Sequence, residues 1–176
     1  MNRLNHWLFS IILGIFSLKY LRAFNLFNFF LAVVFTILVN EIILKHPSIL
    51  EAERKGIPWY SRRTWREEPF GFIFIGLPLA FVLSFLDKIF WILILVPYGS
   101  HIFLDYLCIF ETYSLAPFSK FKKKEGIGIF FPDDLFKKSE NSKRWAKRIK
   151  EKNIKGISEN YFTLINIILL AIALFY

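Results

Sequence analysis

Long apolar runs recur along the whole chain, and they constrain its fold more than any other feature. Five of them approach the roughly 20 residues that a helix needs to cross a bilayer, at residues 7–21, 24–43, 70–86, 89–110 and 161–175. Hydrophobic residues make up 55% of the sequence, including 22 Phe, which is typical of integral membrane proteins. We therefore predict an all-α, multi-pass transmembrane helical bundle of about five spans.

The connections between the runs predict how these helices are arranged. A tight turn around Lys19 and Arg22 joins the first two runs, and Asp87-Lys88 alone separates the third from the fourth. Such short connections place consecutive helices antiparallel, as hairpins. No internal repeat or low-complexity linker interrupts the sequence, so we expect one integral membrane domain, residues 1–176. The first run has no small-residue cleavage site after it and is expected to be a retained span.

The distribution of basic residues predicts the orientation in the membrane, because Lys and Arg near span ends are retained on the cytoplasmic side. They concentrate between Lys45 and Glu68 and in the basic loop 111–160. With five spans, both stretches share a side with the amino terminus. We therefore expect a plasma or inner membrane protein with a cytoplasmic amino terminus. The formal net charge of +9 is then a property of the cytoplasmic face and needs no nucleic acid to explain it.

Two segments of the basic loop suit the anionic headgroups of membrane lipids. Aromatic and basic residues are interleaved at Phe118–Lys124, with the charges gathered in Lys120–Lys124. Residues Ser142 to Lys152 can form a basic amphipathic helix on the bilayer surface, with its cations in Lys143–Lys152. The alternative is a solvated loop whose charge only sets the topology. Nucleic acid is not an expected partner, because no groove-reading motif accompanies the charge.

The most distinctive polar pattern is the pair His101 and Asp105 within the fourth apolar run. Their i,i+4 spacing places both side chains on one face of a helix, where they can share a ligand. Burying them in lipid without a ligand would be costly. Cys108 lies in the same run and is the only cysteine of the chain, so no intrachain disulfide is possible.

Other spans bring polar groups to the same depth. Since a helix rises about 1.5 Å per residue, Asp105 is expected one or two turns below the cytoplasmic boundary. The groups expected near that level are His6, Asn40, Glu41, His46, Glu67 and Glu68. Imidazole and carboxylate groups from several helices are the ligand chemistry of zinc, manganese or iron, and we expect zinc or manganese. A structural His101–Asp105 pair that only holds helices together is the alternative.

Four short segments resemble the predicted membrane-bound, metal-dependent hydrolases, a group that includes the bacterial inner-membrane YdjM-like proteins and small archaeal relatives. Leu4–Ser10 resembles their amino-terminal histidine motif, and Arg62-Arg63-Thr64 resembles the basic residues before their Thr-His-Ser motif. Gly99-Ser100-His101 through Asp105 is similar to their Ser-His-Leu-x-x-Asp motif. Gly126–Pro132 is similar to an apolar segment that follows it.

The resemblance implies a hydrolase that holds a divalent metal. The family's Thr-His-Ser motif is replaced here by Arg66-Glu67-Glu68-Pro69, so Glu68 falls at or near the histidine position. The expected ligands are then His6, Glu68, His101 and Asp105, with Glu67 or Glu41 as general base. The expected substrate is an ester or phosphoester near the cytoplasmic leaflet. The alternative is a non-enzymatic descendant of the same fold that acts as a membrane interaction or structural protein.

Other chemistries lack their sequence signals. The chain has no phosphate-binding glycine loop, no Gly-x-Ser-x-Gly elbow, no Cys-x-x-Cys pair and no His-Glu-x-x-His. A channel or transporter is also disfavoured, because polar groups at one leaflet alone give no path across the bilayer.

Overall fold

The computed structural model describes residues 3–44, 64–107 and 157–175, together with residues 111–112, 124–125 and 130–131. Several predicted features lie outside these residues. They are His46, Cys108, the cations between Lys45 and Arg63, nearly all of Lys120–Lys124, and the surface helix predicted at Lys143–Lys152.

The described chain is helical, as predicted, and its helices fall on the apolar runs. In chain order they are α1 (Arg3–Tyr20), α2 (Leu26–Leu38), η1 (Val39–Ile43), η3 (Trp65–Glu67), α4 (Pro69–Gly71), η4 (Phe72–Gly76), α5 (Leu77–Ser84), α6 (Phe90–Leu107) and α8 (Glu159–Phe175). Of the short elements, η1 and η4 are π-helical continuations and η3 is a 3₁₀ turn.

Four two-residue strands add the only β structure in the described part of the chain. β1 (Glu111–Thr112) pairs antiparallel with β2 (Lys124–Glu125), so that Glu111 lies opposite Glu125. β3 (Phe130–Phe131) pairs parallel with β4 (Ile157–Ser158), which leads directly into α8.

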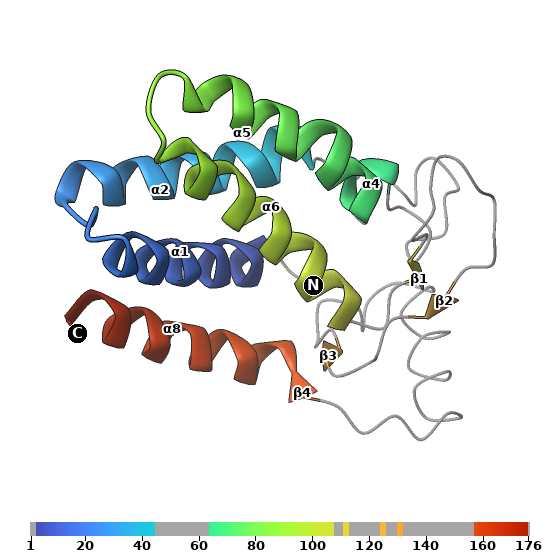
Figure 1. Ribbon diagram of the computed structural model, residues 1–176. Helices are drawn as coiled ribbons and strands as arrows, with labels where there is room; N and C mark the ends of the chain where they lie inside the picture. Colours follow the sequence, from blue (N-terminus) through green and yellow to red (C-terminus); the bar gives the residue numbers. More distant parts are fainter. Residues whose placement is uncertain are drawn as a thin grey trace, which may run out of the picture.

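The helices form the antiparallel bundle that the short connections predict (Figure 1). α1 packs against α2 and α6 on one side and against α8 on the other, and α5 packs against α6. As a result, α1, α4 and α8 begin, and η1 and α6 end, at one end of the bundle (Figure 1). We call this the site end, because it carries the polar residues described below.

At the opposite end, local hydrogen bonds build the turn of the first hairpin. Arg22 adopts a left-handed φ of 55°, and the backbone N–H of Ala23 donates to the carbonyl of Leu18 at 2.8 Å, as in a Schellman ending. Asn25 then caps α2, its Oδ1 accepting from the N–H of Asn28 at 2.8 Å. The chain therefore reverses within a few residues and forms the predicted hairpin.

By length and hydropathy, two of the described helices could cross a membrane. Leu26–Ile43 and Phe90–Leu107 are each 18 residues long and apolar enough to cross a bilayer. The apolar helices Pro69–Ser84 and Tyr161–Phe175 are shorter. The helical fold class is thus confirmed, while the number of spans stays a prediction.

Candidate metal centre

Three of the predicted ligands meet at the site end. His6 lies near the start of α1, while His101 and Asp105 lie one helical turn apart near the end of α6. One ligand atom from each residue can be chosen so that all lie within 4.8 Å of one another. Their relative exposures are 2%, 2% and 4%. The structure thus brings His6 together with two residues that lie 95 and 99 positions later in the sequence, and we call this buried group the His–His–Asp cluster.

Asp105 faces both histidines with different oxygens. Its Oδ1 lies 3.2 Å from His6 Nε2, and its Oδ2 lies 3.4 Å from His101 Nε2. The two imidazole rings are stacked, with centroids 4.0 Å apart and an interplanar angle of 18°. Stacking directs both Nε2 atoms to the same side of the ring pair, toward the carboxylate.

These donors suit a divalent cation. Two imidazole nitrogens and one carboxylate oxygen are the donor types of catalytic zinc sites, which leave a further position for water or substrate. Nε2 of His6 is buried, and its 3.2 Å contact with Asp105 lacks the geometry of a hydrogen bond; a buried donor or acceptor that is incompletely satisfied is costly. A metal bound at Nε2 of His6 would remove part of that cost.

Small side chains allow α1 and α6 to approach closely beside the cluster. Ser10 lies one turn after His6, and its hydroxyl donates to the His6 carbonyl at 2.6 Å. Its Oγ also lies 2.6 Å from Oγ of Ser100, the residue before His101. The Ser100 hydroxyl likewise donates to the carbonyl of Pro97 at 3.1 Å, so either serine can be the donor in the contact between them. Such small polar contacts are common between membrane helices and here fix the relative positions of the two histidines.

Asn40 holds the other side of His101. Its Oδ1 lies 2.6 Å from His101 Nδ1, and its Nδ2 donates to the carbonyl of Thr36 at 2.8 Å. Asn40 is buried on the π-helix η1, and π-helical turns are frequent at functional sites. The sequence predicted that Asn40 lies at the same depth as Asp105, but it did not predict the contact of Asn40 with His101.

The turn before α4 brings the predicted carboxylates onto α6. Oε1 of Glu67 accepts from the hydroxyl of Thr64 at 3.2 Å and from its backbone N–H at 3.4 Å, which is the capping box expected from Thr64-x-x-Glu67. The turn is tied to α6 on both sides of Glu67. Tyr98 donates to the Arg66 carbonyl at 2.6 Å, and Tyr106 donates to Oε2 of Glu68 at 2.9 Å.

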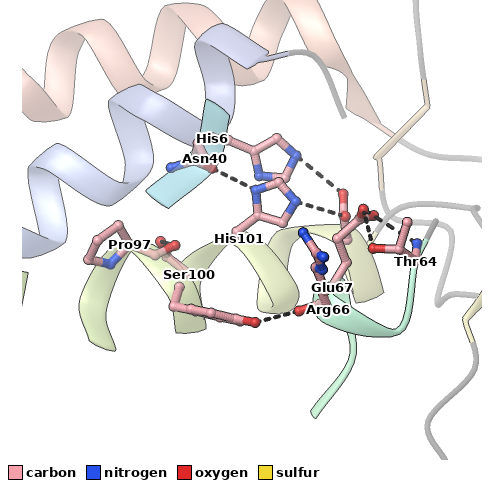
Figure 2. A network of polar contacts seen from close by, with 10 residues as sticks. His6, Asn40, Thr64, Arg66, Glu67, Pro97, Ser100 and His101 are labelled. Atoms are coloured by element: carbon pink, nitrogen blue, oxygen red, sulfur yellow. Dashed lines mark hydrogen bonds and ion pairs between the residues drawn. The ribbon is translucent and has the colours of Figure 1, made fainter. Parts of the chain in front are cut away.

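Because Tyr98 and Tyr106 flank His101 and Asp105 on α6, these two bonds place Glu67 along the stretch of α6 that carries the cluster. Glu67 is fully buried, and Figure 2 shows it between the two histidines and Thr64. The role of Glu67 as a base stays a prediction.

The remaining predicted site residues lie outside the His–His–Asp cluster. Glu68 is fully buried, but its carboxylate is bonded to Tyr106 and does not belong to the group of possible ligands. Glu41 is half-buried on η1, one residue after Asn40, and is not in that group either. The structure therefore brings together three of the four predicted ligands and, of the two predicted bases, places Glu67 on the α6 stretch that carries them.

Comparisons of the chain with protein-family models, with curated proteins and with solved structures gave no match.

Proposed function

We propose that this chain is a multi-pass membrane protein that binds a divalent metal in the His–His–Asp cluster and hydrolyses an ester or phosphoester at the site end. The observation that carries the proposal is the convergence of His6, His101 and Asp105 in a buried position. The resemblance of the segments around His6 and His101 to the predicted membrane-bound, metal-dependent hydrolases agrees with it.

The distribution of side chains supports the membrane part of the proposal. Polar residues such as His6, Ser100 and Asp105 are buried inside the bundle, while large apolar side chains cover its outside. Soluble monomers rarely expose extended apolar surfaces of this kind. On α8 alone, the exposed large aliphatic and phenylalanine side chains are Leu164, Ile165, Ile167, Ile168, Leu169, Ile172, Leu174 and Phe175.

On this basis all five helical segments are proposed to span the membrane with the amino terminus in the cytoplasm. The site end then faces the cytoplasm, close to the headgroups. A lipid or lipid-like ester is therefore the proposed substrate class.

The chemistry divides between the metal and the residues of the chain. A bound zinc or manganese ion would polarise the ester or phosphoester and lower the pKa of an attacking water. His6, His101 and Asp105 would hold the ion, and the stacking of the rings would fix their Nε2 atoms in direction. Glu67 would accept the proton of the water, since its carboxylate is held along the ligand-bearing stretch of α6 by the contacts of Arg66 and Glu68.

A non-enzymatic protein with a purely structural His101–Asp105 pair is the competing proposal. It would need no third group, yet His6 enters the same cluster from another helix and contacts the same carboxylate. The contact of His6 with Asp105 is therefore the observation that favours metal binding over a purely structural pair.

The test is the metal content of the detergent-purified protein, measured by elemental analysis after loading with zinc or manganese. We expect about one ion per chain in the parent and loss of the ion in the His101→Ala and Asp105→Ala variants. Retained metal would justify assays with phosphoester and lipid-ester substrates. A parent that binds neither metal after loading would contradict the proposal and favour the structural alternative.

A further inference from the structure

The orientation of the Asn40 amide is determined by its own backbone contacts. Its nitrogen donates to the Thr36 carbonyl at 2.8 Å, and a carbonyl oxygen can only accept. The amide oxygen must therefore be the atom that faces Nδ1 of His101 at 2.6 Å. A flipped amide would place two acceptors together at Thr36.

This orientation assigns the proton of His101. Because the Asn40 oxygen has no proton, Nδ1 of His101 must carry the hydrogen of the 2.6 Å bond. The form of histidine that binds a metal is the neutral imidazole, which has one N–H, so Nε2 of that form presents a lone pair. That lone pair is directed toward Oδ2 of Asp105, 3.4 Å away.

Two acceptors facing each other in a buried site suit a cation between them. Histidines that bind metals usually donate their other ring N–H to an oxygen, which fixes both the tautomer and the direction of the lone pair. Asn40 contacts Nδ1 of His101 and Asp105 contacts its Nε2, so the two residues engage different nitrogens of the ring.

Asn40 lies on the π-helical turn that continues α2, and its side chain is buried inside the bundle. Thr36, Asn40 and Leu44 are all buried although they are spaced four residues apart, and in a regular α-helix such positions drift around the axis. The backbone N–H of Leu44 donates to the Val39 carbonyl at 2.9 Å, an i→i+5 bond that widens the turn. The wider turn keeps Leu44 on the same inner face of the bundle as Thr36 and Asn40.

We propose that Asn40 is a positioning residue that holds His101 as the Nδ1–H tautomer and thereby aims its Nε2 lone pair at the shared cation site. The proposal rests on the proposed function for the identity of the ligand, a divalent metal, but the tautomer follows from the hydrogen bonds alone. It therefore makes a prediction that does not require metal.

The first measurement is the tautomer of His101 by ¹⁵N NMR of the metal-free protein in detergent. The chain contains only three histidines, so the His6→Gln and His101→Gln variants assign the signals. We expect the Nδ1–H form in the parent, its retention in Asn40→Asp, which keeps an acceptor, and a shift to the Nε2–H form in Asn40→Leu. Thr36→Val is the matched control, because it alters packing beside Asn40 and leaves the Thr36 carbonyl in place.

The second measurement is zinc affinity, determined by competition with a chelator. Loss of an outer-shell partner typically weakens metal binding about 10- to 100-fold, so we expect that loss in Asn40→Leu and rescue in Asn40→Asp. An Nε2–H tautomer in the parent, or equal affinity in Asn40→Leu and the parent, would overturn the role of Asn40. An Nδ1–H tautomer in a parent that binds no metal would support the role of Asn40 in fixing the tautomer and would instead overturn the proposed function.

Discussion

The imidazole of His6 lies over that of His101, with ring centroids 4.0 Å apart and planes 18° from parallel. This stack joins the start of α1 to the last turns of α6 and leaves both Nε2 atoms facing a single carboxylate, that of Asp105. Two helices distant in sequence thus share one acidic group. The arrangement makes the two histidines interdependent, since neither can move without changing what Asp105 contacts.

A matched pair of carboxylate-to-amide substitutions separates the ligands. Asp105→Asn removes the charge that both histidines face, so we expect zinc affinity to fall by more than the roughly 10- to 100-fold typical of an outer-shell loss. Glu68→Gln changes a group bonded to Tyr106, and we expect affinity within about threefold of the parent. Equal losses in the two variants would restore Glu68 to the ligand set.

A second pair tests which carboxylate acts as base. Glu67→Gln keeps an amide oxygen that can accept from Thr64, as Oε1 does in the parent, but it cannot take a proton from water. We expect metal content to be unchanged and turnover of a phosphoester or lipid ester to fall about 10²- to 10⁴-fold, the usual contribution of a general base. Glu41→Gln is the control and should retain turnover. The reverse result, with Glu41→Gln inactive, would assign the base to η1.

Two glycines give contrasting packing predictions. A Cβ at Gly71 would lie 2.2 Å from the carbonyl oxygen of Arg66, whereas at Gly14 the nearest atom, Cβ of Ala32, would be 3.7 Å away. Gly71→Ala must therefore displace the turn that carries Glu67, at a cost of about 2 kcal/mol or more. Gly14→Ala should be neutral or stabilising by up to about 1 kcal/mol through helix propensity.

Thermal unfolding in detergent would measure both glycine variants against the parent. We expect the midpoint to fall in Gly71→Ala and to hold or rise in Gly14→Ala. A Gly71→Ala protein as stable as the parent would show that the turn before α4 is not held against Gly71 as the structure describes.

The helices, and the three residues of the His–His–Asp cluster, could be predicted because the length of an apolar run and the position of a residue along a helix follow from the sequence. Runs such as 89–110 are hydrophobic enough to mark α6, and the i,i+4 spacing fixes His101 and Asp105 on one face. Depth also pointed to His6. Each of these inferences depends on distance along a helix, which follows directly from residue number.

Rotation about the helix axis could not be predicted in the same way. Asn40 and Glu41 are adjacent and equally deep, yet Asn40 is buried and contacts His101, whereas Glu41 is half-buried. The π-helical turn at η1 on which both residues lie leaves no clear sequence signal. The carboxylates of Glu67 and Glu68 also have different partners, Thr64 and Tyr106, because their directions depend on the backbone turn before α4. Here a signal existed: Thr64-x-x-Glu67 is a capping-box pattern, and it indicates that one oxygen of Glu67 turns back toward Thr64.

The predicted topology can be tested by labelling single cysteines introduced along the chain, because only one native cysteine has to be removed. Replacing Cys108 with Ser gives a cysteine-free chain, into which one cysteine is introduced at a time. With five spans and a cytoplasmic amino terminus, the turns at Arg22 and Lys88 lie outside, so Arg22→Cys and Lys88→Cys should react with a membrane-impermeant maleimide in intact cells. Lys55→Cys and Lys122→Cys should react only after permeabilisation, because basic stretches are retained in the cytoplasm.

A cysteine that follows α8, at Tyr176, tests whether α8 crosses the membrane. Tyr176→Cys should be labelled in intact cells, like Lys88→Cys, if α8 crosses the membrane. Protection of Tyr176→Cys alone would mean that α8 does not cross the membrane. Its apolar stretch, Tyr161–Phe175, is shorter than the two helices that are long and apolar enough to span. Labelling of Lys55→Cys in intact cells would invert the orientation and place the site end, with His6, His101 and Asp105, on the outer face.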